Sequence, residues 1–322
     1  MKKVLVSGSI AFDYLMKFEG FFKDFLLQKD LDSLNISFTG IDKKMHYGGC
    51  GANICYSFAL FGGKNIQSIL YGIVGKDFKQ YGEKLTKDGV NCKFIGTNND
   101  KFTASAYILT DNKENQITIY SPGPSEKHKS EEKLNYKEFD YAILSPDICD
   151  RTVRIAKKIT DTHVPWFFDP GQMTHVFKLD DLKYLVKNAL GIIVNSYELK
   201  LLYTRLKISE KNLKATVGIL IETLGKDGIK IFGKNKKEVH INAVKPKKII
   251  EPTGCGDAFR GGLLAGLSDG LKLKDACKIG VLTATYKIET QGTQNHKFNS
   301  REFCERYKKA FGEKRCPLML IK

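Results

Sequence analysis

The sequence has no apolar run long enough to form a membrane-spanning helix. At its start, the apolar residues Val4–Val6 are followed at once by Ser7, Gly8 and Ser9, which makes this run far too short for a signal peptide. Internal repeats and low-complexity linkers are also missing from the 322 residues. We therefore expect a cytoplasmic protein without a membrane contact, in which residues 1–322 form a single domain.

The cysteines lack the Cys-x-x-Cys spacing of metal sites and redox pairs, although the chain has 8 of them. A chain of this length can bury a substantial core without disulfides or a structural metal. With 42% hydrophobic and 27% charged residues, the composition is that of an ordinary folded protein. We expect the cysteines to be free thiols, mostly buried.

Basic residues are abundant but not clustered. The formal charge of +16 would suit a protein that neutralises nucleic-acid phosphates. However, the lysines are spread over the whole chain, with only short concentrations at Lys234–Lys237 and Lys245–Lys248 and no aromatic-interleaved basic motif. A lysine-rich surface that attracts anionic nucleotides is the favoured interpretation. A basic nucleotide- or nucleic-acid-binding protein without catalysis stays open as an alternative from another class.

Apolar segments alternate with segments of helical periodicity along most of the chain. The first, Val4–Val6, runs into a glycine turn at Gly8, as a buried strand of an α/β sheet does. Further strands are predicted at Ile69–Val74, Tyr141–Leu144, Trp166–Phe168, Gly191–Val194 and Val217–Glu222. Helices are predicted at Ala52–Leu60, Lys79–Lys87, Arg151–Thr160 and Leu179–Leu190. This alternation predicts a three-layer α/β/α fold with a mainly parallel central sheet.

Two segments break this rhythm because apolar and polar residues alternate in them one by one. The first lies between Phe12 and Tyr47. The second is a hairpin whose strands, Thr103–Leu109 and Gln116–Tyr120, flank a turn at residues 111–115. Together they predict a small antiparallel sheet, built from about residues 12–47 and 94–122, that forms a lid over a site beside the α/β body.

A glycine-rich turn precedes an apolar helical segment near residue 255. Residues 253–257 read Thr-Gly-Cys-Gly-Asp, and Ala258, Phe259 and Leu263 follow at helical spacing. Glycines let the backbone approach a ligand closely, and the unpaired N–H groups at a helix start bind anions. Asp257 is placed to accept a proton from a substrate hydroxyl beside that anion site, as phosphoryl transfer requires. The same residue could instead be an ordinary helix N-cap, and its spacing alone does not separate the two roles.

Several motifs, in the same order, resemble the ribokinase-like (PfkB) family of sugar and nucleoside kinases along nearly the whole chain. They are residues 8–13 (Gly-Ser-Ile-Ala-Phe-Asp), 47–53 (Tyr-Gly-Gly-Cys-Gly-Ala-Asn) followed by 61–63 (Phe-Gly-Gly), 195–198 (Asn-Ser-Tyr-Glu), 223–228 (Thr-Leu-Gly-Lys-Asp-Gly) and 254–257 (Gly-Cys-Gly-Asp). Taken singly, each could be a turn or a helix cap. Together they fall at predicted strand ends, where open α/β sheets bind ligands.

The resemblance implies a role for the residues in each motif. Asp257 is expected to be the catalytic base, beside an anion hole formed by Gly254, Cys255 and Gly256. The residues expected to bind the acceptor substrate are Asp13, Gly48, Gly49 and Asn53. Those expected to bind ATP are Asn195, Thr223, Gly225, Gly228 and Gln294, and Glu198 is expected to arrange Mg²⁺, which prefers oxygen ligands and keeps several waters.

Two residues near the 254–257 loop depart from the family pattern. Glu251 stands where the family usually has Asp, and Cys255 replaces the commoner alanine. Neither change removes a catalytic group. The first puts in doubt the monovalent-cation site that some members build beside this loop. We therefore expect Mg²⁺ with ATP as the phosphoryl donor, and regard a monovalent cation as doubtful.

The resemblance also implies an acceptor. Residues 254–260, Asp169–Gln172 and 292–294 are similar to the bacterial adenosine and nucleoside kinase branch. This implies transfer of the ATP γ-phosphoryl group to a nucleoside 5′-hydroxyl, with adenosine leading and AMP and ADP as products. A ribokinase- or fructokinase-type free-sugar kinase is the nearest alternative. We expect a monomer or homodimer that binds these small molecules and not nucleic acid. The aromatic residues suited to stacking on a purine, although packing is the favoured role of each, are Phe12, Phe38, Phe102, Tyr107 and Tyr120.

Overall fold

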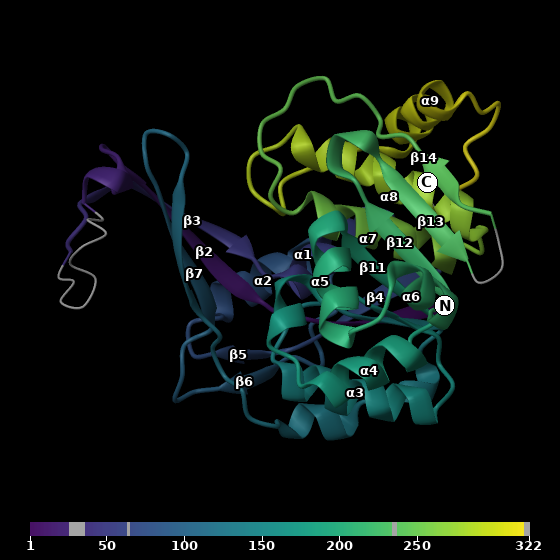
Figure 1. Cartoon of the computed structure of the whole chain (residues 1–322), viewed down its shortest axis with the longest axis horizontal. Coiled ribbons are helices and arrows are strands. Elements are labelled where there is room, and N and C mark those ends of the chain that lie inside the picture. The colour runs from purple at the N-terminus through teal and green to yellow at the C-terminus, as the bar shows by residue number, and fades with distance from the viewer. Residues whose placement is uncertain (26–35, 63–64, 234–236, 319–322) are drawn as a thin grey trace.

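The structure is a computed structural model that describes residues 1–25, 36–62, 65–233 and 237–318. Gly63, most of the Lys234–Lys237 run and part of the expected lid segment at 12–47 lie outside these ranges. Figure 1 shows a large α/β body and a smaller sheet that projects from one side of it. Within the described ranges, no helix is long and apolar enough to cross a membrane.

The body is organised around a large sheet whose described strands follow the order β14-β13-β12-β11-β10-β9-β1-β4. These strands are β1 (Lys2–Ser7), β4 (Ile66–Tyr71), β9 (Tyr141–Leu144), β10 (Trp166–Phe168), β11 (Gly191–Asn195), β12 (Ile219–Thr223), β13 (Ile229–Gly233) and β14 (Val239–Ile241). The pairs from β12 to β4 are parallel, and only the β12-β13 and β13-β14 pairs are antiparallel. The parallel strands therefore present their carboxyl ends at one edge, where ligands of such sheets bind.

Helices cover both faces of this sheet, because successive residues of a strand point to opposite sides. Val4 and Val6 of β1 belong to the core formed with α1 (Cys50–Ala59), α2 (Lys79–Lys87), α7 (Cys255–Ser268), α8 (Leu273–Ile288) and α9 (Ser300–Phe311). Leu5, between them, belongs to the core formed with α3 (Cys149–Asp161), α4 (Leu179–Asn188), α5 (Ser196–Leu206) and α6 (Glu210–Thr216). The three-layer α/β/α fold predicted from the sequence is confirmed.

The segment predicted as one strand at Ile69–Val74 is in fact two strands in two sheets. β4 ends at Tyr71, and Ile73–Gly75 forms β5, which pairs with β6 (Gly96–Asn98). The change of direction falls at Gly72, whose carbonyl accepts a hydrogen bond from the Gly96 N–H. A continuous apolar run does not reveal such a change, because both strands are buried.

The small sheet has the order β3-β2-β7-β8. Its strands are β2 (Ala11–Phe18), β3 (Gly40–Gly48), β7 (Ala104–Thr110) and β8 (Gln116–Ser121). The prediction of a purely antiparallel sheet is wrong, because β2 and β7 pair in parallel. Gly48, Ala11 and Ala104 are paired across the sheet where it joins the body, and we call this row the base of the small sheet.

The cysteines are free thiols, as expected. The prediction that most are buried is wrong, because only Cys55 and Cys277 are. Cys50 and Cys255 are the first residues of α1 and α7, and both are partly exposed at these helix starts.

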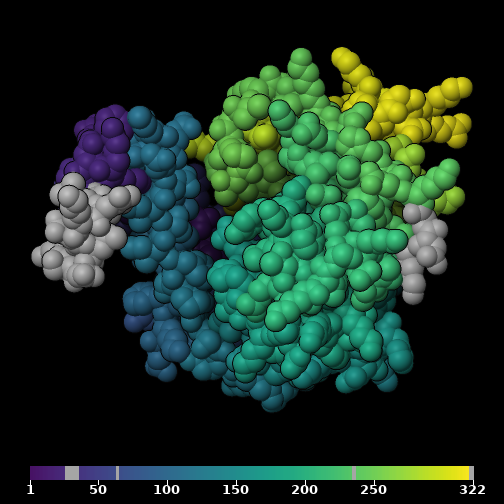
Figure 2. All heavy atoms as spheres, in the orientation of Figure 1, coloured from purple at the N-terminus to yellow at the C-terminus, as the bar shows by residue number. Residues whose placement is uncertain are grey.

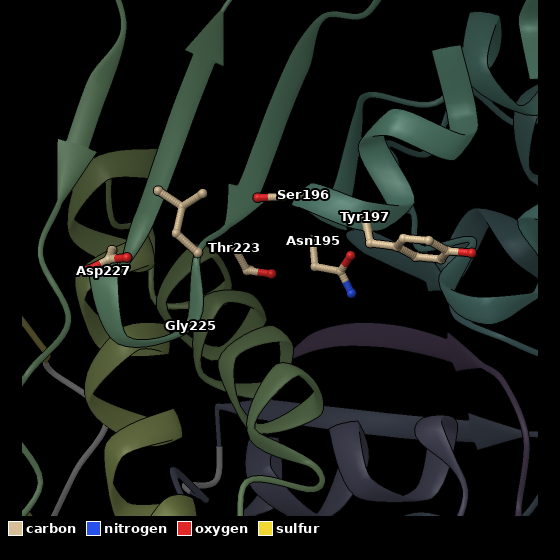
Figure 3. Close-up of a pocket in the computed structure, with 7 residues that line it drawn as sticks. Asn195, Ser196, Tyr197, Thr223, Gly225 and Asp227 are labelled. Atoms are coloured by element: carbon tan, nitrogen blue, oxygen red, sulfur yellow. The ribbon is translucent and has the colours of Figure 1, made fainter. Parts of the chain in front are cut away.

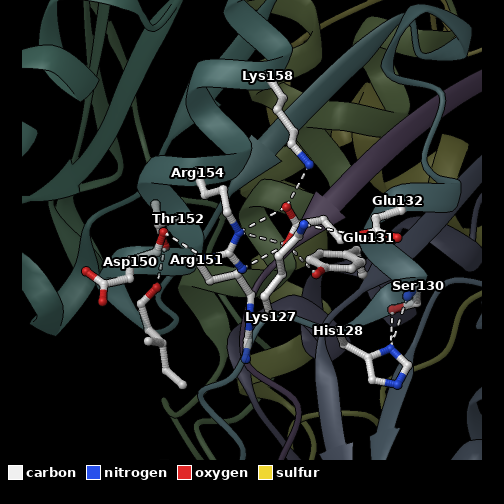
Figure 4. A network of polar contacts seen from close by, with 12 residues as sticks. Lys127, His128, Ser130, Glu131, Glu132, Asp150, Arg151, Thr152, Arg154 and Lys158 are labelled. Carbon is white, nitrogen blue, oxygen red and sulfur yellow. Dashed lines mark hydrogen bonds and ion pairs between the residues drawn. The ribbon is translucent and has the colours of Figure 1, made fainter.

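A buried carboxylate fastens the segment after the small sheet to α3. Glu131 is 0% exposed and accepts hydrogen bonds from Arg154 Nη2 at 2.8 Å and Lys158 Nζ at 2.9 Å. Arg154 Nε also donates, to both oxygens at 3.0 Å, and Tyr71 is the third donor residue, through its hydroxyl at 3.1 Å. Figure 4 shows Arg154 and Lys158 converging on the Glu131 carboxylate. Burial alone would raise the pKa of Glu131, but Arg154 and Lys158 outweigh it and lower the pKa to about 2.

Candidate active site

The 253–257 loop begins α7 with a glycine at the N-cap. Gly254 has φ 83°, a left-handed conformation that favours glycine, and no side chain caps the helix. A Cβ atom at this position would also come within 2.9 Å of Thr293 Cγ2. Asp257 lies inside the first turn, so it is not the N-cap residue. The N–H groups of this turn are therefore free of side-chain caps, as an anion-binding helix start requires.

Asp257 is partly buried and is held by a neighbouring helix. Asn53 of α1 donates a hydrogen bond from Nδ2 to Asp257 Oδ2 at 2.9 Å. Burial raises the pKa of Asp257, while the Arg260 guanidinium and hydrogen bonds from Asn53 and Cys50 partly offset this shift. A carboxylate with a raised pKa is a stronger base than an exposed aspartate, which suits removal of a hydroxyl proton.

Arg260, one turn further along α7, is a buried charge to which the sequence analysis gave no role. It is 6% exposed and pairs with Asp169, which follows β10 and is 2% exposed. Arg260 Nε lies 2.6 Å from Asp169 Oδ2, and Nη2 donates to Oδ1 at 2.7 Å. Nη2 also donates to the Ile193 carbonyl at 3.2 Å, so the arginine ties α7 to two central strands. An arginine within an apolar, glycine-rich helix was the signal that could have identified it.

The acceptor residues expected from the sequence gather near the base of the small sheet. Asp13 lies on β2 and is partly buried. Burial, and then the charges of Asp257 and Glu251, raise the pKa of Asp13 to about 6, so these carboxylates share one region. Gly48 leaves room for Asp13, because a Cβ atom there would overlap its carboxylate. Gly49 follows as the N-cap of α1, which carries Asn53. Figure 2 shows a recess between the small sheet and the body.

Gln294, which is expected to bind ATP, lies inside the protein with its side-chain amide already paired. Its side chain is 3% exposed, and its Nε2 donates to Asn53 Oδ1 at 2.9 Å and to the Tyr81 hydroxyl at 2.6 Å. Lys84 donates to Gln294 Oε1 at 3.3 Å. Its side chain therefore holds the Asn53 amide in place, and its role in ATP binding stays a prediction. Sequence position alone does not give the direction of the side chain.

The other residues expected to bind ATP lie at or just beyond the carboxyl ends of β11 and β12. Asn195 and Thr223 are register partners in these strands, and Figure 3 shows them beside the turn that contains Gly225. We call the cavity at this edge the nucleotide pocket. It measures about 440 Å³ and is lined by Asn195, Ser196, Tyr197, Thr223, Leu224, Gly225 and Asp227. Gly228 does not line it but closes the same turn, with φ 89°.

The 195–198 motif forms the helix cap that was its alternative explanation, and it also borders the nucleotide pocket. Asn195 Oδ1 accepts from the Glu198 N–H, and Glu198 Oε2 accepts from the Asn195 N–H, each at 2.8 Å. Glu198 is nevertheless close enough to the start of α7 for its charge to raise the pKa of Asp257. Among the described residues, no group of three or more His, Cys, Asp or Glu side chains could hold a metal ion.

Known proteins resemble this chain over nearly its whole length. Residues 1–299 match the family described as pfkB family carbohydrate kinase. A nucleoside kinase of Methanocaldococcus jannaschii is 29% identical over 300 residues, which cover 92% of this chain and 93% of the relative. A ribokinase of Lactococcus lactis subsp. lactis is 29% identical over 307 residues, which cover 91% and 93%.

Solved structures show the same relationship. The structure of Burkholderia thailandensis nucleoside kinase in complex with inosine matches with a TM-score of 0.82 and 32% identity, covering 97% of this chain and 99% of that one. The family match includes the small sheet and the 254–257 loop. The chain therefore belongs to the pfkB family of carbohydrate kinases and is a ribokinase-like phosphotransferase that acts on a hydroxyl group.

Proposed function

We propose that this kinase transfers the γ-phosphoryl group of ATP to the 5′-hydroxyl of a nucleoside, with adenosine as the leading acceptor. The observation that carries the proposal is the position of Asp257. It is hydrogen-bonded to Asn53 at 2.9 Å, and its charge acts on Asp13 on the acceptor side. The charge of Glu198, beside the nucleotide pocket, acts on Asp257 in turn. Asp257 is therefore close enough to both groups of residues, those proposed to bind the acceptor and those proposed to bind ATP, to interact with their charges.

In the proposed reaction, Asp257 accepts the proton of the acceptor hydroxyl while that oxygen forms a bond to the γ-phosphorus. The bond from the γ-phosphorus to the bridging oxygen breaks, and ADP leaves with that oxygen. Negative charge is spread over the γ-phosphoryl oxygens during this step. The uncapped N–H groups at the start of α7 lie next to Asp257 and would stabilise that charge.

The residues proposed to bind ATP are chosen by their position around the nucleotide pocket. Asn195, Thr223 and Gly225 line the nucleotide pocket and are proposed to hold ATP, while Gly228 shapes the turn. Glu198 uses Oε2 in the helix cap and is partly exposed, so its carboxylate fits an Mg²⁺ ion that is bound mainly by phosphate and water oxygens. Such an ion would neutralise phosphate charge, and a protein cage of several carboxylates is not needed for it.

Two observations bear on the acceptor class. The Methanocaldococcus jannaschii relative is named a nucleoside kinase, and the Burkholderia thailandensis enzyme binds inosine, which supports a purine nucleoside. On the small sheet, Tyr120 keeps 50% of its surface exposed and is available to stack on a base. It is the register partner of Ala106, which pairs with Asp13, so it lies on the same face as Asp13. Tyr107 lies on the other face, where its ring stacks on Tyr14. Phe12, in contrast, is 5% exposed and packs against Tyr47 and Tyr81.

A free-sugar kinase is the second candidate, because the Lactococcus lactis ribokinase is as similar in sequence, at 29%, as the archaeal nucleoside kinase. ATP consumption with Mg²⁺ should be measured against adenosine, inosine, guanosine, cytidine, ribose and fructose. We expect adenosine to give the highest kcat/KM and 5′-deoxyadenosine, which lacks the receiving hydroxyl, to give no product. A clear lead for ribose or fructose would overturn the nucleoside assignment and leave the kinase chemistry intact.

A further inference from the structure

Lys287 is a buried lysine at the end of α8 whose hydrogen bonds go to backbone carbonyls. It is 0% exposed. Its Nζ donates to the Glu251 carbonyl at 3.0 Å and to the Thr290 carbonyl at 3.2 Å. These are its hydrogen bonds among the described residues, and an ammonium group has three donors.

Lys278, on the same helix, shows the more usual way to bury such a charge. It is 8% exposed, and its ammonium pairs with the carboxylates of Glu313 and Asp275. A buried charge is costly unless it is paired or hydrogen-bonded. The charge of Lys287 is not neutralised by a salt bridge with any described carboxylate. Its burial is therefore not explained by an ordinary structural ion pair.

The side chain of Lys287 runs beneath the anion-binding loop. A Cβ atom on Gly254 would lie 3.5 Å from Lys287 Cε. The two carbonyls that Lys287 binds belong to different segments: one comes just before that loop, and the other lies in the turn after α8. The same two segments are joined again by the Glu251 carboxylate, which accepts from the Gly292 N–H at 2.8 Å.

The charges around Lys287 are those of the catalytic loop. Burial lowers the pKa of Lys287, and the neighbouring Cys255, Glu251 and Asp257 oppose this effect. Burial, and then the charge of Lys287, lower the pKa of His296, which is 1% exposed. Lys287 thus directs its charge at the helix start where phosphoryl oxygens are proposed to gather.

We propose that Lys287 is a positioning residue for phosphoryl transfer: its ammonium is a cation built into the chain, which joins the segments around Glu251 and Thr290 and adds positive potential beneath residues 254–257. It acts through the loop and not by contact with the acceptor. The inference rests on the proposed function, because it assigns the loop to the γ-phosphoryl group. Since the cation is covalently attached, the wild-type rate does not depend on added K⁺.

Chemical rescue tests this role. In Lys287→Ala, kcat should fall by about tenfold to a hundredfold, because the loop is no longer held in its position. The acceptor KM should be nearly unchanged, because the residues proposed to bind the acceptor stay in place. Propylammonium, which matches the deleted side chain, should restore a large part of kcat. 1-Propanol, of the same length but neutral, should not. Lys278→Ala is the matched control on the same helix, and propylammonium should leave its rate unchanged.

Lys287→Gln keeps the hydrogen-bonding ability but removes the charge, and it serves if the alanine variant does not fold. A wild-type kcat in Lys287→Gln would overturn the proposal, as would wild-type activity that requires K⁺. Failure of propylammonium to rescue a folded Lys287→Ala would also overturn it. All rates are measured with the best acceptor of the panel, so a sugar in place of adenosine would change the proposed function without affecting this test.

Discussion

Asn53 Nδ2 donates a hydrogen bond to Asp257 Oδ2 at 2.9 Å, across an interface between α1 and α7. Its other amide atom, Oδ1, accepts from Gln294, so the amide is fixed at both ends. An amide that is held in this way can keep the carboxylate in one orientation before the substrate arrives. The orientation of the proposed base is therefore set by direct contact between the two helices.

 The two residues are 204 positions apart in the sequence, and the fold alone brings them together.

Gln294→Leu tests this arrangement. Leucine lacks the amide of Gln294, so Asn53 loses one of its two hydrogen bonds. The kcat should fall by about tenfold to a hundredfold, because Asp257 is then less well positioned. The KM for ATP should stay the same, since Gln294 is buried beside Asn53 and Tyr81. Steady-state kinetics with both substrates varied checks this. A raised ATP KM with an unchanged kcat would instead support the role in ATP binding that the sequence predicts.

Asp257→Asn should bind ATP and lose most of its turnover. An amide cannot accept the hydroxyl proton, and loss of a general base costs about 10² to 10⁴ in rate. ATP binding is measured by calorimetry and turnover by ADP release. Asp180→Asn is the control, because the Asp180 side chain is 97% exposed on α4. Normal turnover in Asp257→Asn would contradict the assignment of the base.

Asp13→Ala should mainly raise the KM for the acceptor. The residue is proposed to accept hydrogen bonds from substrate hydroxyls, and a hydrogen bond to a charged group is worth about 1.5–3 kcal/mol, or roughly tenfold to a hundredfold in binding. The kcat should change much less. Asp24, exposed in the short helical turn that follows β2, supplies the control Asp24→Ala. An unchanged acceptor KM would remove Asp13 from the site.

Glu198→Gln separates the helix cap from the proposed metal role. A glutamine at this position can still complete the capping box with Asn195, so the melting temperature should hardly change. The Mg²⁺ concentration that gives half-maximal rate should rise by about tenfold or more. Glu210→Gln, in the first turn of α6, is the matched control. If the Mg²⁺ dependence stays as in the wild type, Glu198 is only a cap.

Glu131 should make stability depend on pH in the acid range. Its pKa is lowered from 4.5 to about 2, so its contribution is complete above pH 4.5 and is lost as the pH falls towards about 2. A shift of this size corresponds to roughly 3 kcal/mol. Urea unfolding between pH 7 and pH 2.5 measures it.

The matched variants for that experiment are neighbours in the chain. Glu131→Gln leaves Arg154 and Lys158 facing a neutral group, so it should be destabilised at pH 7 and lose less stability in acid. Glu132→Gln should behave like the wild type, because the Glu132 side chain is 63% exposed. Equal acid sensitivity in Glu131→Gln and the wild type would show that other groups cause the loss.

The body of the fold could be predicted because its signals are local. Tyr141–Leu144 and Trp166–Phe168 are short apolar runs, and each is a strand with the predicted bounds. The pairing of β2 with β7 could not be predicted, since alternation shows which face of a strand is buried but not which strand lies beside it.

The same distinction applies to the site. The turn and helix start before Asp257 could be predicted, because the glycines that mark them are close together in the sequence. Arg260 and Lys287 went unassigned because their partners, Asp169 and the Glu251 carbonyl, are 91 and 36 residues away. The contacts of Gln294 with Asn53 and Tyr81 could not be predicted for the same reason: a motif gives the position of a residue, whereas its partners are supplied only by the fold.

The base of the small sheet also has a mechanical consequence. Strands rise about 3.3 Å per residue, so along β2 Asp13 lies about 7 Å beyond Ala11 and Lys17 about 20 Å beyond it. If the sheet turns about its base, Lys17 travels about three times as far as Asp13 for the same angle. Asp13 is therefore close to the axis of such a rotation. A large displacement of the outer end of the small sheet would move the Asp13 carboxylate only slightly relative to the hydroxyls that it is proposed to bind.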